Sequence, residues 1–196
     1  LRQKQGVMLG KTRIIEQAKD EIARYFDGRG TGFTVRLAGH GRGSAPMAEV
    51  SAGDWVEDIA EAMAIGRRLG DRVLVIATST GGTLAAIAAT DPALSQGMAG
   101  IVMVSPNFGV KPAAAKMLDL PLARYWAPLV AGEMREFTPA NPEQARYWTT
   151  RYPTLALFPM AALVRHISHV SSDKRKPVKS GSCVTNTMRK KHARWG

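Results

Sequence analysis

The sequence is poor in cysteine and has no long apolar run. Its 196 residues include one cysteine, Cys183, so an internal disulfide framework and a cysteine zinc cluster are both excluded. No apolar stretch approaches the roughly 20 residues that span a bilayer, and the polar start LRQKQ does not begin a secretory signal. These absences predict a cytoplasmic protein without a membrane span, and the chain length suits a single domain.

Acidic residues are scarce near the C-terminus, and this shortage accounts for most of the positive charge. The formal net charge is +11, and residues 171–196 hold eight lysines and arginines against one acid, Asp173. One interpretation is an arm that binds nucleic acid or an anionic membrane, since basic side chains neutralise phosphates. The arm has a single aromatic residue for base stacking, Trp195. The rest of the chain is nearly balanced, and we expect no specific nucleic-acid partner.

Short apolar runs alternate with amphipathic ones through the first 110 residues. This alternation predicts an α/β fold with a mostly parallel sheet. Ser51, followed three residues later by Asp54, resembles a capping box at the start of a helix, and Gly70 suits its C-terminal cap. The expected strands are residues 7–9, 33–37, 73–77 and 101–104, and the expected helices are 14–26, 51–69 and 83–90.

The amino-acid composition of the chain changes after residue 110. Prolines and aromatic residues recur from there to 153, which favours short helices in an inserted cap. One amphipathic helix with a bend at Pro159 is then expected, before a basic, polar segment that cannot bury enough apolar surface to order itself. The predicted division is a core of residues 1–110, a helical cap of 111–153, a core helix of 154–170 and a disordered tail of 171–196.

The apolar run RVLVIA breaks at three hydroxyl residues and passes into the alanine-rich segment GGTLAAIAA. A nucleophile elbow needs a strand, a sharp turn with the serine at its apex, and a helix that starts at once. Ala77 and Gly81 supply the small residues two before and two after Ser79. Ser79 is therefore the candidate nucleophile, and the Thr80 N–H at the helix start is the candidate oxyanion donor.

Two other interpretations of this turn stay open. The serine could merely cap the helix that follows it. The turn could also bind phosphate, although it lacks the Gly-x-Gly-x-x-Gly spacing and the lysine of a P-loop.

Several motifs then follow one another in the order of a known family. They are LAGHGRGS after GFTVRL, the helix SAGDWVEDIAEAM, the turn VIATSTGGTLA, and GIVMVSPNFGV before a segment with ARYWTTRYP. Residues 33–170 resemble α/β-hydrolases of the serine aminopeptidase and monoacylglycerol lipase group, which includes carboxylesterases. The resemblance implies a three-layer α/β sandwich with a helical cap and an acyl-enzyme on Ser79. It also implies a small-molecule ester or acylglycerol substrate, less often an amide, and no metal or organic cofactor.

Two parts of the family pattern are missing. The family's first core strand ends in His-Gly, which supplies a second oxyanion donor, whereas the strand at 7–9 is followed by Gly10 and Lys11. The N–H of Gly10 or Lys11 would have to replace it. The two strands that carry the triad Asp and His after the cap are not recognisable, as expected for a frameshifted or truncated C-terminal region or for a natural basic tail.

None of the four histidines replaces the missing base. His40 lies in the glycine-rich turn, where we expect a structural role. His166 and His169 have a spacing that suits a metal, but no third ligand accompanies them, so surface or core packing is expected. His192 and Asp173, the only acid after the cap, fall in the basic tail. The triad His and Asp are therefore unassigned, and no metal is expected.

The sequence thus predicts a serine hydrolase of the carboxylesterase or lipase type, impaired because its base is not identifiable. The alternative is a non-catalytic protein of the same fold that binds small apolar ligands. Nothing in the sequence indicates an oligomeric state.

Overall fold

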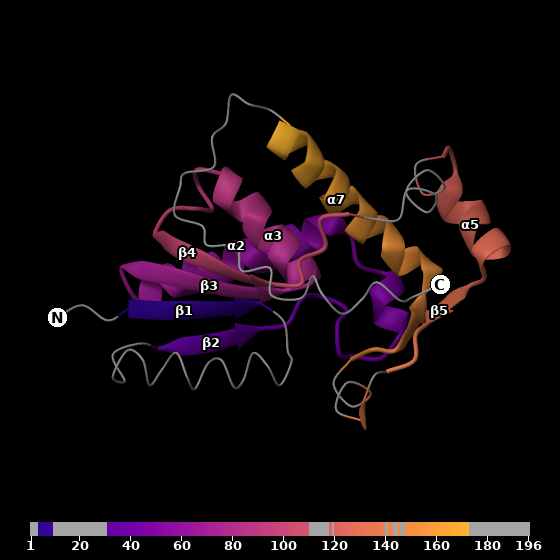
Figure 1. Cartoon of the computed structure of the whole chain (residues 1–196), viewed down its shortest axis with the longest axis horizontal. Helices are drawn as coiled ribbons and strands as arrows, with labels where there is room; N and C mark the ends of the chain where they lie inside the picture. The colour runs from indigo at the N-terminus through magenta and orange to yellow at the C-terminus, as the bar shows by residue number, and fades with distance from the viewer. Residues whose placement is uncertain are drawn as a thin grey trace.

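The computed structural model describes residues 4–9, 31–109, 118, 120–139, 141–142, 145 and 148–172. Its main sheet has four parallel strands in the order β2-β1-β3-β4 (Figure 1). These strands are β1 (Lys4–Leu9), β2 (Gly32–Val35), β3 (Arg72–Thr78) and β4 (Met98–Val104). All four strands therefore end at one edge of the sheet, which is where ligands bind in open parallel sheets.

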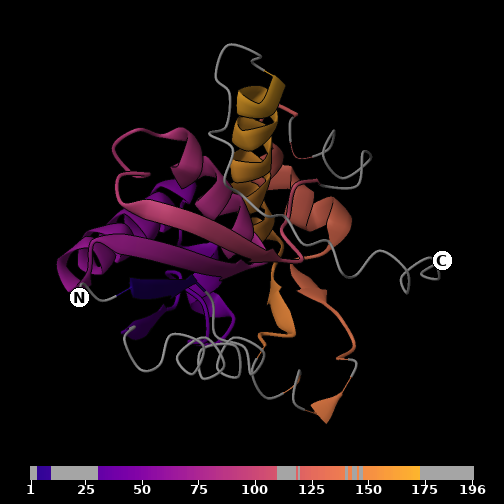
Figure 2. The same ribbon diagram turned by 60° about the vertical axis from the view of Figure 1, so that its left-hand side comes forward.

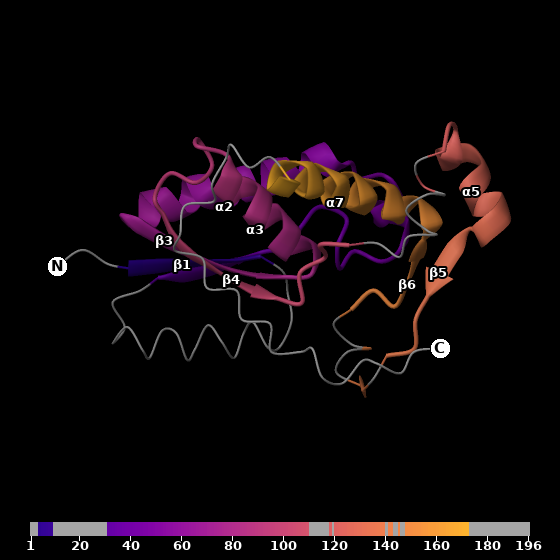
Figure 3. The ribbon, with the colours of Figure 1, turned by 45° about the horizontal axis from the view of Figure 1, so that its top comes forward.

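Three described helices cover one face of this sheet, as Figures 1 and 3 show. They are α2 (Ala52–Leu69), α3 (Thr80–Thr90) and α7 (Leu157–Ser172), and α7 packs against both α3 and α2. The core between helices and sheet includes Trp55, Ile59, Met63, Val73, Val75, Leu84 and Leu163. On the other face of β3, Ile76 packs with Leu74 and Val102. Within the described residues, no helix has both the length and the apolar character of a bilayer span.

Helix α2 begins at the predicted capping box. The Ser51 N–H donates to Asp54 Oδ2 at 2.7 Å, and the Asp54 N–H donates to Ser51 Oγ at 3.2 Å. Hydrogen bonds from the backbone and the side chain of Ser51 lower the pKa of the Asp54 carboxyl, because they favour its charged form. Gly70 follows the helix as expected, and its N–H donates to the Gly66 carbonyl at 3.0 Å. Its φ of −172° makes this end extended rather than left-handed.

The described residues between 120 and 153 lie beyond the edge where the parallel strands end (Figures 1 and 2). They contain α5 (Ala123–Ala131) and an antiparallel pair of strands, β5 (Met134–Glu136) and β6 (Arg151–Pro153). The segment thus holds a short helix, as expected, and two short strands that were not predicted. Strands of three residues are too short to show the alternation by which a strand is recognised in a sequence.

The helix predicted from residue 154 begins later and ends later. Residues Thr154–Ala156 form a short 3-10 turn, η2, and α7 continues to Ser172. Pro159 lies in the first turn of α7, where its missing N–H has no helical partner, so it removes no helical hydrogen bond. Residues 171 and 172 complete α7, while the rest of the predicted tail and the helix expected at 14–26 lie outside the described residues.

Candidate active site

Ser79 stands at a sharp turn between β3 and α3. The strand ends at Thr78 and the helix begins at Thr80, so one residue makes the whole connection. Its φ of 51° and ψ of −122° are rare for a residue with a side chain and cost on the order of 1–3 kcal/mol. The Ser79 side chain makes no capping hydrogen bond to α3, which contradicts the alternative that this serine only caps the helix.

The end of β4 and the chain that follows it hydrogen-bond to both peptide groups of Ser79. The Ser79 N–H donates to the Val104 carbonyl at 3.0 Å, and the Ser79 carbonyl accepts from the Asn107 N–H at 3.3 Å. Thr78 Oγ1 also donates to the Val104 carbonyl, at 3.2 Å. Ser105 lies between these contacts and has a φ of 46°. The unusual backbone of Ser79 is therefore stabilised by the neighbouring strand as well as by its own helix.

At Gly82 the backbone of α3 packs closely against this chain. A Cβ on Gly82 would lie 2.8 Å from Pro106 Cβ and 3.2 Å from Pro106 Cα, so no larger residue fits without a shift. Sequence reasoning assigned the need for small residues to Ala77 and Gly81. Both of these are buried, and the structure adds Gly82 as a position where a Cβ would be too close to its neighbour.

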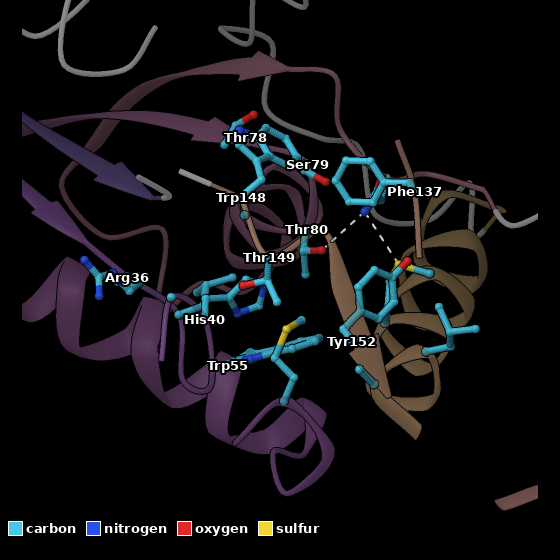
Figure 4. Close-up of a pocket in the computed structure, with 18 residues that line it drawn as sticks. Arg36, His40, Trp55, Thr78, Ser79, Thr80, Phe137, Trp148, Thr149 and Tyr152 are labelled. Carbon is cyan, nitrogen blue, oxygen red and sulfur yellow. Dashed lines mark hydrogen bonds between the residues drawn. The ribbon is translucent and has the colours of Figure 1, made fainter. Parts of the chain in front are cut away.

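Thr80 and Asn107 are joined beside the serine. Thr80 is the first residue of α3, so its N–H has no partner within the helix and lies at the positive end of the helix dipole. Asn107 Nδ2 donates to Thr80 Oγ1 at 3.2 Å and to Met160 Sδ at 3.6 Å, the two dashed contacts of Figure 4. Gly10, the weaker candidate for the oxyanion hole, lies outside the described residues.

Asn107 is a site residue that sequence reasoning missed. The one signal for Asn107 was its position in the sequence, three residues after the end of β4. That strand ends at the same edge of the sheet where Ser79 lies. Nothing in the sequence indicated which residues its side chain would contact.

A cavity of about 530 Å³ opens beside Ser79 (Figure 4). Ser79 itself is half-buried, and the cavity walls include residues of the glycine-rich turn, Phe137, residues 148, 149 and 152, and the first turn of α7. Six aromatic and thioether side chains contribute to the lining: Met47, Trp55, Phe137, Trp148, Tyr152 and Met160. Among the residues that the structure describes, no aspartate or glutamate lines this cavity. Such a lining suits an apolar ligand group.

His40 lines the same cavity from the glycine-rich turn. Its Nδ1 lies 3.1 Å from the Ala38 carbonyl, and its ring packs on the Trp55 indole with centroids 5.5 Å apart. Trp55 Nε1 donates to the same carbonyl at 3.0 Å, and the Ala38 N–H donates to Asp58 Oδ2 at 2.7 Å. The imidazole is thus engaged with the turn and α2, and no described histidine makes a hydrogen bond with Ser79.

The glycine-rich turn itself folds back against η1, a 3-10 helix at Ala45–Ala48. Gly39 has a φ of 74°, and a Cβ there would lie 2.9 Å from both the Pro46 carbonyl oxygen and Val50 Cγ1. Only glycine accepts both this positive φ and these short distances, so Gly39 shapes the turn that carries His40 to the cavity.

The other histidines lie away from Ser79 or outside the described residues. His166 and His169 are exposed on α7, and no three described residues of the metal-binding types come together as a possible metal site. His192 and Asp173 are not among the described residues.

Comparisons with known proteins agree with this fold. The sequence matches the family model described as alpha/beta hydrolase family over residues 18–179, and a search of curated proteins finds no match. A structure reported for LipS and LipT, two metagenome-derived lipolytic enzymes, has 22% identity and a TM-score of 0.61. That likeness covers 85% of this chain and 69% of the other.

A second solved structure is the Paleococcus ferrophilus monoacylglycerol lipase, with 14% identity and a TM-score of 0.58. The likeness covers 94% of this chain and 75% of the lipase. At these identities the two structures show a shared fold. The family match spans most of the sequence, and this chain belongs to the alpha/beta hydrolase family.

Proposed function

We propose that this protein is a serine hydrolase that acts on carboxylic esters through an acyl-enzyme on Ser79. The observation that carries the proposal is the turn at Ser79, where a half-buried serine with positive φ faces an apolar cavity at the start of a helix. Membership of the alpha/beta hydrolase family supports hydrolysis as the reaction. The lipolytic enzymes and the monoacylglycerol lipase that share the fold support esters as the substrate class.

The proposed reaction has two steps. Ser79 Oγ bonds to the ester carbonyl carbon, the bond to the alcohol oxygen breaks, and the alcohol leaves with a proton. Water then attacks the acyl-enzyme, releasing the acid and restoring the serine. In both steps the Thr80 N–H, with Gly10 as a possible second donor, would stabilise the negative carbonyl oxygen.

We expect the rate of ester hydrolysis to be low, because no described residue can act as the general base for Ser79. No described histidine makes a hydrogen bond with Ser79, and no described carboxylate lines the cavity. A serine hydroxyl is a weak nucleophile without a base, and the oxyanion site and substrate binding alone leave only residual catalysis. We therefore expect slow turnover from this chain.

The proposed acyl group is small or medium-sized and apolar. Residues 111–153 would act as a cap. Three aromatic residues of this segment, Phe137, Trp148 and Tyr152, line the cavity that Ser79 faces. Burial of an alkyl chain against these aromatic rings would provide most of the binding free energy.

An alkyl fluorophosphonate tests the proposal directly. Ser79 Oγ would bond to phosphorus while the P–F bond breaks, and fluoride would leave as the serine proton passes to solvent. We expect wild type to be labelled on the peptide that contains Ser79, and Ser79→Ala to remain unlabelled. Ser105→Ala is the matched control, since it removes another positive-φ serine at the same edge of the sheet and should leave labelling intact. Folded wild type that takes up no label would contradict the proposal.

The second candidate is a binding protein of the same fold, and the lack of a base among the described residues favours it. It predicts saturable binding of an apolar ester or alcohol, read as a change in tryptophan fluorescence, with neither turnover nor labelling. Trp55 and Trp148 line the cavity and would report such binding.

A further inference from the structure

The chain that follows β4 turns back over the elbow of Ser79. The positive φ of Ser105 redirects it, and Pro106 then packs against the backbone of Gly82. Asn107 comes to lie beside the first turn of α3, half-buried and on the cavity wall. Three consecutive residues after the strand thus place one amide side chain next to the proposed nucleophile.

The Asn107 side chain connects two parts of the site that lie far apart in the sequence. One contact runs from Nδ2 to Thr80 Oγ1 at 3.2 Å, and the other from Nδ2 to Met160 Sδ at 3.6 Å (Figure 4). An amide nitrogen carries two hydrogens, so both contacts can form together. The start of α3 is therefore tied to α7 through this amide.

The backbone of Asn107 makes separate contacts. Its N–H donates to the Ser79 carbonyl at 3.3 Å, and its carbonyl accepts from Thr83 Oγ1 at 2.6 Å. A substitution of the side chain leaves the atoms of both backbone contacts in place. The contribution of the amide group can therefore be measured apart from that of the backbone.

We propose that Asn107 is a positioning residue for hydrolysis at Ser79, and that it acts through the Thr80 hydroxyl. This inference rests on the proposed roles of Ser79 and Thr80. A threonine hydroxyl at a helix start competes for nearby backbone N–H groups. By donating to Thr80 Oγ1, Asn107 takes one of the two acceptor sites of that oxygen and fixes the side chain, which keeps the Thr80 N–H turned to the place where an oxyanion would form. A donor of this kind has to lie within hydrogen-bond distance of the oxyanion, so a small rotation of the peptide lowers the rate.

The test is a double-mutant cycle on fluorophosphonate labelling. Asn107→Ala should lower the limiting rate of labelling about three- to tenfold, as expected for one hydrogen bond, with the half-saturating probe concentration unchanged. Thr80→Val removes the accepting hydroxyl and keeps the N–H, and it should cause a similar loss. The double variant should be no slower than the slower single variant, because both substitutions break the same contact.

The control variant is Asn141→Ala, which removes the same side chain from an exposed position outside the site. It should label within about twofold of wild type. If the losses of the two single variants multiply in the double variant, Asn107 does not act through Thr80. A change in the half-saturating concentration alone would make Asn107 an ordinary part of the cavity wall. Either result overturns the proposal.

A second variant covers the case in which Asn107→Ala does not fold. Asn107→Leu keeps nearly the size of the side chain and removes both amide hydrogens without adding a charge. Its labelling should also be about three- to tenfold slower than that of wild type. A wild-type rate for Asn107→Leu would overturn the proposal.

Amide hydrogen exchange separates this inference from the proposed function. If folded wild type takes up no label, the proposed function fails, but the Gly82 and Thr83 N–H groups still report on the elbow because both donate to the Ser79 carbonyl. Their exchange should be about three- to tenfold faster in the Asn107 variants, and unchanged in Asn141→Ala. Equal exchange in all variants would show that the amide does not position the elbow.

Discussion

Gly82 and Pro106 lie in direct contact across the turn that presents Ser79, and a Cβ on Gly82 would lie 2.8 Å from Pro106 Cβ. Gly82→Ala should therefore lower the free energy of unfolding by about 1–3 kcal/mol, because a rigid proline ring and a helix backbone must move apart. Urea unfolding measures this change. Gly100→Ala is the control, since its Cβ would make an ordinary contact, 3.5 Å from Leu74 Cδ1. Equal stability of the two variants would show that the contact at Gly82 is not tight.

The capping box of α2 makes part of the stability depend on pH. The pKa of the Asp54 carboxyl is lowered from its ordinary value of 3.8 by hydrogen bonds with Ser51. A pKa that is lower in the folded state adds stability that is fully present above the ordinary value and is lost as the pH falls through the folded-state value. Asp54→Asn should therefore lower the melting temperature at about pH 7, and its difference from wild type should shrink at about pH 3.

Glu57→Gln, a substitution on the same helix outside the capping box, provides the comparison for Asp54→Asn. It should not reproduce the pH-dependent difference. A difference between Asp54→Asn and wild type that stays the same at both pH values would show that the capping carboxylate does not contribute in this way.

Thr154 links the end of β6 to the chain after α5. Its side chain is fully buried, its hydroxyl donates to the Gly132 carbonyl, and its N–H donates to the Glu133 carbonyl at 2.8 Å. Thr154→Val keeps the shape but leaves a carbonyl without its partner, so the free energy of unfolding should fall by about 1–3 kcal/mol. The half-buried Thr150 provides a matched Thr→Val control. An equal effect at Thr150 would mean that the buried hydroxyl bond adds nothing.

Trp148 lines the cavity, and 40% of its surface is exposed. Trp148→Ala should raise the half-saturating concentration of an octyl fluorophosphonate roughly fivefold, which corresponds to about 1 kcal/mol of lost apolar contact. A methyl fluorophosphonate should show little change, because its alkyl group is too short to cover the indole. Tyr125→Ala, which removes an exposed aromatic ring of α5 from outside the cavity lining, is the control. If Tyr125→Ala gives the same shift, the alkyl chain does not bind in the cavity.

The sequence predicted the parts of the fold that depend on local pattern. A continuous apolar run identifies β3, and the hydroxyl at Ser79 between Ala77 and Gly81 identifies the turn, because each signal lies within a few neighbouring residues. The capping box of Ser51 and Asp54 is local in the same way, and its two hydrogen bonds are present.

Features that depend on distant partners were not predictable. The contact of Asn107 with Thr80 joins residues 27 positions apart, and neither residue type requires the other. The tight contact at Gly82 depends on Pro106, so the sequence placed it one residue early. The strands β5 and β6 pair with each other across a long connection and have no periodicity of their own.

Because Val104 and Asn107 hydrogen-bond to the two peptide groups of Ser79, the reactive geometry depends on the assembled sheet as well as on the strand–serine–helix motif. A nascent chain that stopped before Val104 would contain that whole motif and yet leave the serine free to relax. During refolding, reactivity toward fluorophosphonates should therefore emerge when β4 docks beside β3, later than the helical signal of α3.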